Sequence, residues 1–442
     1  TLNFFLKKKK NLNTYNFNLS FFFNYEFCWI LLIFFITFII SLLYPPNSLD
    51  SLSYHLPRIL SWSQQESVNF YPTNDLRELI MGPFSQYVIL HLYLLSGGDF
   101  LFNIVQWTAM FVSCITISLI SKEFGCNIKY QIFTILFCAT IPIGILQSTS
   151  TQTDYVATMW LTIIAYSIIK FISTQSLKNI FLFSSSLGLG LLTKGTVYIF
   201  GFSFCIWIAI YLISKRKNFR YLFLIPLIVI TINLGHFIKN QDLTSNPIGL
   251  VNENNIYTNK IINLSSFSSN LIRNTGLNLA VPSQNINLNF TKKFIDKLHD
   301  YIGISSRDTR TTKGGGYYIP FSFYESTAPN TFHFLIIMVS LILLATQNKS
   351  RVQKHYSLSV LFGYLFFSLI MVWAIQNNRH LLSFFVLSSP IVAFSLMSLK
   401  INKLQNIISI LLILYSIPYL LFNKSRPLLG ELKVIDKKIE LN

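Results

Sequence analysis

Long apolar stretches alternate with short polar segments along this chain of 442 residues. A helix needs roughly 20 apolar residues to cross a bilayer, so each run of roughly 17 to 25 predicts a transmembrane span. The predicted spans are 27–44, 101–121, 130–146, 155–172, 179–193, 196–213, 219–237, 332–346, 356–375, 381–399 and 404–422. We therefore expect an all-α polytopic membrane protein with about eleven transmembrane helices, within a range of about ten to thirteen.

The loops at every second span end are basic, which predicts the orientation of the chain, because short cytoplasmic loops collect lysine and arginine. These loops contain Lys122 and Lys129, Lys170 and Lys178, three basic residues at 215–217 with Arg220, Lys349 with Arg351 and Lys354, and Lys400 with Lys403. The four lysines at 7–10 should hold the N-terminus in the cytoplasm. The short apolar stretch 84–95 is expected in the outer interface or as a re-entrant segment, since a further span would invert every later basic loop.

The spans divide the chain into five parts. They are a basic cytoplasmic N-terminus (1–26), an N-terminal transmembrane module (27–237) with a first outer loop (45–98), a large outer loop (238–331) between the seventh and eighth spans, a C-terminal transmembrane module (332–422) and a tail (423–442). We expect short amphipathic, interfacial helices in the first loop. The large loop is rich in Asn, Ser and Thr and has no long periodic segment, which is typical of a functional or disordered loop. The tail is expected outside, although it is basic.

Composition supports this class of protein. Hydrophobic residues make up 52% of the chain and charged residues only 12%. The net charge of +18 could indicate nucleic-acid binding, but the basic residues lie in clusters between apolar runs, where they act as topology signals and headgroup contacts. We therefore expect membrane lipids and no nucleic acid as partners. The five cysteines show no paired spacing, so neither a disulfide framework nor a zinc site is indicated. The first run lacks a small-residue cleavage site, so no cleavable signal peptide is expected.

Asp50 is the first candidate for chemistry, because it follows the first span and precedes His55 and Arg58. Charged groups at the end of a membrane helix are costly and often functional, yet Asp50 could instead cap a short helix by accepting from the N–H of Ser53. With the predicted orientation the unusual polar residues at helix ends all fall on the outer side. They are Asp50, His55, Arg58, Asp154, Lys194, His236, Lys239, Arg379 and His380. This one-sided distribution favours a shared site.

Four further residues leave more than one interpretation each. Asp154 could be a helix N-cap, or it could accept from a sugar hydroxyl or orient Arg58. Lys194 could reach lipid headgroups or bind a lipid phosphate, and Arg379 has the same alternatives with a better geometry for phosphate. Lys313 precedes three glycines and could cradle a phosphate, but it lacks the spacing of a P-loop, so a flexible hinge is favoured.

Together these elements resemble the type C glycosyltransferases, and in particular bacterial members related to protein O-mannosyltransferases and to the lipid A aminoarabinose transferase. The motifs are the outer Asp50 followed by Tyr54-His55 and Arg58, the Asp154-Tyr155 pair, Leu-Thr-Lys-Gly-Thr at 192–196, Gly-His-x-x-Lys-Asn at 235–240 with Asn246-Pro247, and Arg379-His380-Leu381. The resemblance covers about residues 27 to 430. It implies an outer-facing site, a polyprenyl-phosphate sugar donor and Asp50 as catalytic residue. Ser51 departs from the pattern, since relatives often carry a second acidic residue there, and Lys239 stands where many have Arg.

The chemistry of such a transfer needs a carboxylate to take the proton of the acceptor and cations to stabilise the departing phosphate. Asp50 is the expected general base, and Arg58, Lys194 and Arg379 are expected around the phosphate. The full set of expected substrate-binding residues is Tyr54, His55, Arg58, Glu78, Asp154, Lys194, His236, Lys239, Arg379 and His380. No nucleotide or redox cofactor is needed, and a divalent metal is compatible with the site but not required.

The expected partners are therefore a polyprenyl-phosphate-linked sugar and a lipid, glycan or protein acceptor, with the protein integral to the inner cell membrane. The main alternative is a transporter or flippase for a lipid-linked or anionic solute. Transporters usually place their charges at the midplane and contain repeated halves. Here the charges lie at helix ends and no repeat is found. A noncatalytic scaffold would explain the large loops but not the ordered motifs.

Overall fold

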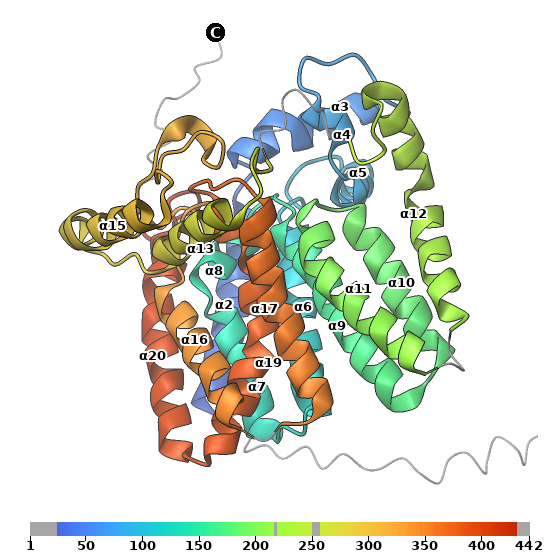
Figure 1. Ribbon diagram of the computed structural model, residues 1–442. Coiled ribbons are helices and arrows are strands. Elements are labelled where there is room, and N and C mark those ends of the chain that lie inside the picture. The colour runs from blue at the N-terminus through green and yellow to red at the C-terminus, as the bar shows by residue number, and fades with distance from the viewer. Residues whose placement is uncertain (1–23, 216–218, 250–256, 348, 431–442) are drawn as a thin grey trace, which may run out of the picture.

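The computed structural model describes residues 24–215, 219–249, 257–347 and 349–430. The predicted spans fall on long helices that form one upright bundle (Figure 1). These helices are α2 (Tyr25–Leu43), α6 (Ile104–Glu123), α7 (Ile128–Ala139), α9 (Asp154–Thr174), α10 (Leu177–Leu191), α11 (Thr196–Ser214), α12 (Tyr221–Thr244), α16 (Thr331–Thr346), α17 (Arg351–Ile370), α19 (Leu382–Leu399) and α20 (Asn402–Leu421). The described part of the chain contains isolated β-bridges but no strands, so the prediction of an all-α fold is confirmed.

Several helices are long and apolar enough to cross a membrane, so the chain is an integral membrane protein. Among the described residues seven single helices meet this measure, or eight spans if the bent pair of α7 and α8 (Pro142–Ser148) counts as one. The helices α10 and α16 are apolar but shorter. The number of about eleven spans remains a prediction, because it also counts these two helices and α17.

The predicted span 130–146 is broken by a bend of 71° between α7 and α8. Proline has no N–H and its ring clashes with the preceding turn, so Pro142 ends α7 and begins the next helix at its first turn. Thr140 adds to the break, because its hydroxyl donates to the carbonyl of Leu136 at 2.7 Å. The bend is followed by the buried polar residues 147–153, which lead from α8 to α9.

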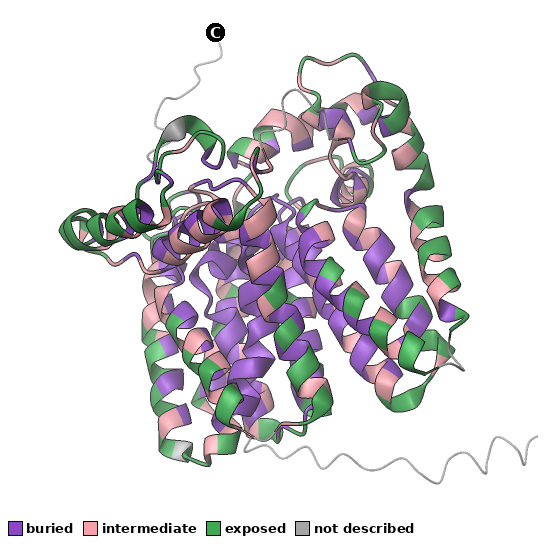
Figure 2. Ribbon diagram, in the orientation of Figure 1, coloured by how far each residue is buried: buried purple, intermediate pink, exposed green. Residues whose placement is uncertain are grey.

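The centre of the bundle is buried, and exposed residues lie on its outer helices (Figure 2). The central helix is α19, in which 83% of the apolar window is buried, whereas in α12 only 17% is buried. A helix that is apolar all round must be enclosed by protein or by lipid. The exposed apolar side chains of α12, such as Phe223, Leu227 and Ile230, are therefore placed to face lipid.

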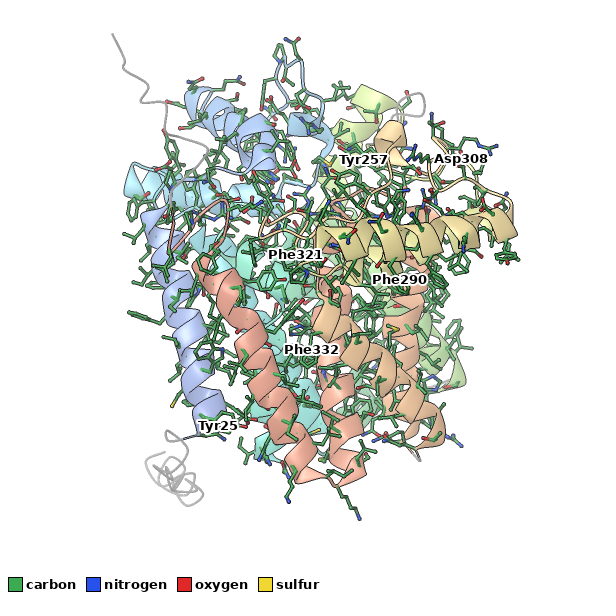
Figure 3. The ribbon with its side chains drawn as sticks, turned by 90° about the vertical axis from the view of Figure 1, so that its left-hand side faces the viewer. Tyr25, Tyr257, Phe290, Asp308, Phe321 and Phe332 are labelled. Atoms are coloured by element: carbon green, nitrogen blue, oxygen red, sulfur yellow. The ribbon has the colours of Figure 1, made fainter. Side chains whose placement is uncertain are left out.

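One end of the bundle carries a thick polar layer, which we call the Asp50 end. Figure 3 labels Tyr25 at the opposite end and Tyr257 and Asp308 in this layer. The loop after α2 supplies the π-helix η2 (Ser51–His55), α3 (Leu56–Gln64), α4 (Arg77–Ile80) and α5 (Phe84–Ser96). Figure 1 places α5 beside α3 and α4 at this end.

The long loop, residues 245–330, also belongs to the Asp50 end, because it begins after α12 and ends where α16 begins. The expectation that it has no long periodic segment is wrong. It contains α13 (Leu264–Asn278), α14 (Gln284–Ile286), η5 (Asn287–Lys292), α15 (Lys293–Ile302) and η6 (Lys313–Gly315). Hydrophobic periodicity misses α13 because its buried face carries amides, Asn270, Asn274 and Asn278, at helical spacing.

The first residues after α20 pack on the same end as Asp50. Arg426 is fully buried, forms an ion pair with Glu325 and donates from Nη1 to Asn47 at 2.5 Å. The Tyr44 hydroxyl donates to the carbonyl of Pro427 at 2.6 Å. The beginning of the tail thus helps to hold the segment that leads into Asp50. Residues 431–442, with their lysines, lie outside the described residues.

Candidate active site

Asp50 lies directly before η2 and its side chain does not cap that helix. Its Oδ2 accepts from Nη2 of Arg379 at 2.5 Å instead. The nearby N–H of Ser51 donates to the hydroxyl of Ser48 at 3.2 Å. The capping interpretation of Asp50 is therefore wrong, and its carboxylate is committed to a cation from a distant part of the chain.

Arg379 comes from α18 (Asn377–His380), a short helix between α17 and α19. Its guanidinium also donates to the side chain of Gln152, which lies in the buried segment between α8 and α9. The Arg379 and Asp50 side chains are only 11% and 16% exposed, so their ion pair is shielded from water but still reachable. A pair of this kind is stronger than one at the surface.

A second ion pair lies beside the first. Lys194, in the turn between α10 and α11, donates from Nζ to Oδ1 of Asp154 at 2.7 Å. The N-cap position of α9 is Thr153, and Asp154 is the first helical residue, so Asp154 is not the cap. His380 Nδ1 lies 3.8 Å from the same oxygen, beyond hydrogen-bond distance. The N-terminal ends of α9 and α11 thus lie near the segment that carries Arg379.

The charges of these groups influence one another. Burial raises the pKa of the Asp50 carboxyl. The charge and hydrogen bond of Arg379, together with the charge of Lys194, lower it by more, so the pKa of Asp50 lies below its usual range. Burial lowers the pKa of Lys194, and the charge of Asp154 offsets this only in part. For Arg379, the lowering by burial is outweighed by Asp50 and Asp154, so its pKa is raised. Burial lowers the pKa of His380 to about 4, which leaves a neutral imidazole at pH 7.

Tyr54 and His55 line the next part of the site. Their ring centroids are 4.2 Å apart, and the guanidinium of Arg77 lies 4.8 Å from the centroid of the Tyr54 ring. Burial lowers the pKa of His55 to about 3, and its Nδ1 is hydrogen-bonded to Gln86. The His55 imidazole is therefore neutral at pH 7. Sequence reasoning missed Gln152 and Arg77, because a glutamine in a polar run and an arginine beside an aspartate are both common at surfaces.

Arg58 is buried but does not face the Asp50 site. Its guanidinium donates to the carbonyl of Glu78, to those of Arg77 and Met81 at 3.0 and 2.9 Å, and to Gln86 Oε1 at 3.4 Å. The prediction that Arg58 joins Lys194 and Arg379 around one phosphate is therefore wrong, as is the idea that Asp154 orients it. Arginine presents five donors in a planar fork, and here they satisfy carbonyls around α4.

Three other expected site residues also lie apart from Asp50. The Glu78 carboxylate accepts from the hydroxyl of Tyr71 at 2.6 Å. His236 Nε2 lies 3.2 Å from the carbonyl of Ile80, and Lys239 Nζ donates to the carbonyl of Val68 at 3.1 Å. His236 and Lys239 thus join α12 to the first loop, where they line a cavity of about 180 Å³ with Trp62, Phe70 and Leu192.

Comparisons with known proteins agree with this fold. Residues 81–236, less than half of the chain, match the protein family described as dolichyl-phosphate-mannose-protein mannosyltransferase. The crystal structure of ArnT from Cupriavidus metallidurans bound to undecaprenyl phosphate is similar, with a TM-score of 0.53 and 12% identity over 86% of this chain and 62% of ArnT. The archaeal oligosaccharyltransferase AglB from Archaeoglobus fulgidus, in complex with an inhibitory peptide and a dolichol-phosphate, has a TM-score of 0.48 and 10% identity over 90% of this chain and 55% of AglB. No curated protein sequence matches the chain.

The chain is a polytopic membrane protein whose fold is similar to that of ArnT, and the resemblance to the type C glycosyltransferases seen in the sequence motifs is confirmed. Residues 81–236 are the part that resembles the dolichyl-phosphate-mannose-protein mannosyltransferase family. That segment contains Asp154 and Lys194 but neither Asp50 nor Arg379. The chain spans 62% of the length of ArnT, so roles for these residues have to be argued from their geometry.

Proposed function

We propose that this protein is a glycosyltransferase that moves a sugar from a polyprenyl-phosphate donor to an acceptor in the cell envelope. The observation that carries the proposal is the shielded pair of Asp50 and Arg379, 2.5 Å apart, beside the pair of Lys194 and Asp154. It combines a carboxylate for the acceptor with cations for a phosphate. The similarity in fold to ArnT, whose crystal structure contains undecaprenyl phosphate, supports a donor of this chemical class.

Asp50 is the proposed general base. The acceptor oxygen attacks the anomeric carbon and gives its proton to the Asp50 carboxylate, while the bond from that carbon to the phosphate oxygen breaks and its electron pair stays with the phosphate. The phosphate gains negative charge in this step, and Arg379 and Lys194 stabilise it. The Nε of Arg379 and the Oδ2 of Asp154 are buried without a hydrogen-bond partner in the described part of the chain, which leaves polar capacity for a substrate.

Donor binding would make Asp50 a stronger base. In the structure Arg379 keeps the Asp50 carboxylate ionised, which also makes it a weak proton acceptor. A donor phosphate competes with Asp50 for the same guanidinium. Once the charge of Arg379 is shared with the phosphate, burial, which raises the pKa, has the larger influence on Asp50. The base would then be activated only when the donor is in place.

The first units of the lipid chain would occupy the cavity of about 180 Å³ beside Leu192, two residues from Lys194. Its walls include Trp62, Phe70 and Ile232 on the lipid-facing side of the first loop and α12. In this arrangement His236 and Lys239 would contact the lipid chain rather than the phosphate.

The orientation of the site follows from the basic loops, so the Asp50 end is proposed to face outward from an inner cell membrane. Hexosyl and pentosyl donors are both compatible with the site. No group of three or more His, Cys, Asp or Glu that could hold a metal ion occurs in the described ranges. That the reaction needs no divalent metal remains a prediction, and it is tested by retention of activity in EDTA.

The test is identification of the lipid-linked sugar that accumulates in cell membranes when the protein is absent. The proposal expects one polyprenyl-phosphate sugar to accumulate and to be consumed when purified protein is added to extracts containing the acceptor. If no lipid-linked sugar accumulates and the protein consumes none, the proposed function is wrong.

A further inference from the structure

Lys313 belongs to the long loop, yet its backbone is fixed beside the site. Its N–H donates to the carbonyl of Trp373 at 2.9 Å, and the N–H of Trp373 donates to the carbonyl of Thr311 at 2.9 Å. On the other side, the N–H of Val372 donates to the carbonyl of Tyr257 at 3.0 Å. Residues 371–373 lead directly into the helix that carries Arg379, so Lys313 starts from a segment next to that helix.

The segment before Lys313 is held by a buried arginine. Arg273 of α13 is fully buried and donates to the carbonyl of Ser306 at 2.8 Å, to the hydroxyl of Thr311 at 3.0 Å and to the hydroxyl of Thr312. Releasing this segment would leave several buried donors unsatisfied, which is costly. We expected a flexible hinge at Lys313. The residues directly before Lys313 are instead held in place by Arg273.

The residues after Lys313 leave open space. Gly314 has a φ of +73°, and a Cβ added at Gly314 or Gly316 would meet nothing within 4 Å. Larger residues here would occupy the space beside the lysine. The two glycines therefore leave the backbone beside Lys313 uncovered.

Lys313 is within electrostatic reach of the site. Its Nζ lies 5.4 Å from the centroid of the Tyr257 ring. Burial lowers the pKa of Lys313, the charge of Asp50 raises it, and the charges of Arg379 and Arg77 lower it again. The ammonium and the carboxylate of Asp50 are thus close enough to influence each other.

Lys313 differs from the other cations of the site in having no carboxylate partner within the described residues. Arg379 pairs with Asp50 at 2.5 Å, Lys194 with Asp154 at 2.7 Å, and Arg77 with Asp75 at 2.6 Å. At each of these three cations an entering anion competes with a carboxylate that is already bound. It can bind Lys313 without displacing any.

We infer that Lys313 binds the phosphate of the lipid-linked donor and is the first cation to receive it, before the pair of Asp50 and Arg379 opens. This inference rests on the proposed function. Lysine acts as a mobile point charge on a four-carbon stem, which suits the capture and transfer of a phosphate. The long loop would thus contribute directly to donor binding.

The test uses the full chain purified in detergent and farnesyl phosphate as the probe, with farnesol as the uncharged control. Because Lys313→Gln removes a charge-assisted contact, it should weaken farnesyl phosphate binding roughly 10- to 100-fold, whereas Lys313→Arg should retain most of it. The matched control is Lys297→Gln, which removes an exposed lysine from α15 of the same loop and should change nothing. Farnesol should bind all four proteins equally.

The possible results distinguish an error in the role of Lys313 from an error in the proposed function. Equal binding of farnesyl phosphate by the original chain and by Lys313→Gln would overturn the role of Lys313 and leave the proposed function standing. No binding by the original chain would overturn the donor class as well. Competition by phosphatidylglycerol as strong as that by unlabelled farnesyl phosphate would identify Lys313 as a headgroup anchor and overturn its assignment to the donor.

Discussion

Two buried arginines at the Asp50 end, Arg58 and Arg379, have different kinds of partner. Arg58 is held by three backbone carbonyls and a glutamine, and Arg379 by a carboxylate and a glutamine. Backbone carbonyls are neutral and do not take a proton at ordinary pH, so an arginine that satisfies them has a structural role. A carboxylate paired with an arginine can be replaced by a phosphate or can take a proton. The kind of partner, rather than burial or charge, therefore separates the two roles.

The largest effect on transfer among the cations is expected for Arg379→Gln. This change removes a phosphate ligand and the group that lowers the pKa of Asp50, so the rate should fall by roughly three orders of magnitude. The base works only when ionised, so activity is present above the pKa of Asp50 and lost below it. Because Arg379 lowers that pKa, its removal should move the acid limb of residual activity to higher pH. A pH profile of transfer at constant protein level measures both effects.

Arg58→Met should affect folding instead. It leaves carbonyls around α4 without donors, so the free energy of unfolding should fall by about 3 kcal/mol while transfer per folded molecule changes little. Thermal melting in detergent and the activity of the folded fraction test this. A large loss of kcat without loss of stability would place Arg58 in the reaction and would erase the distinction from Arg379.

Lys194→Gln should lower transfer roughly 10- to 100-fold and also reduce stability, because it leaves the Asp154 carboxylate buried without its cation. The double variant Lys194→Gln with Asp154→Asn removes the unpaired charge. It should recover stability but not activity. Recovery of both would show that Lys194 serves only to neutralise Asp154.

Lys239→Gln should have the smallest effect. Its ammonium contacts Val68 and Asn69 at an exposed position, so stability should change by less than about 0.5 kcal/mol and transfer less than about threefold. A strong and selective loss of donor binding would return Lys239 to the phosphate site.

Much of the fold follows from the sequence because hydrophobic runs determine where helices cross a membrane. The helix α13 could not be predicted in this way, because asparagine and serine form its buried face and the usual hydrophobic signal is missing. Pro142 indicates a bend in the predicted span 130–146, but the length of the apolar run favoured one continuous helix.

The site was predictable only in part. The basic loops place Asp50, Lys194 and Arg379 at one end of the bundle, which the structure bears out. Asp50 and Arg379 are 329 residues apart, so no local pattern could pair them. Arg58 was expected beside Lys194 and Arg379 because all three fall on the same predicted side of the membrane. The π-helix and α3 instead direct its side chain to α4, and such directions depend on tertiary packing.

The central claim is that the Asp50 carboxylate accepts the proton of the acceptor, and Asp50→Asn tests it most directly. Asparagine keeps the shape of the side chain and loses its basicity. The measurement is transfer of labelled sugar from its polyprenyl phosphate in reconstituted membranes, with Asp308→Asn as the control. Asp308 pairs with Arg310 at 2.7 Å in the long loop, and its pKa is also lowered by that pair. We predict a loss of roughly two to four orders of magnitude for Asp50→Asn and activity close to that of the original chain for Asp308→Asn. Transfer by Asp50→Asn at the level of the Asp308→Asn control would contradict the account.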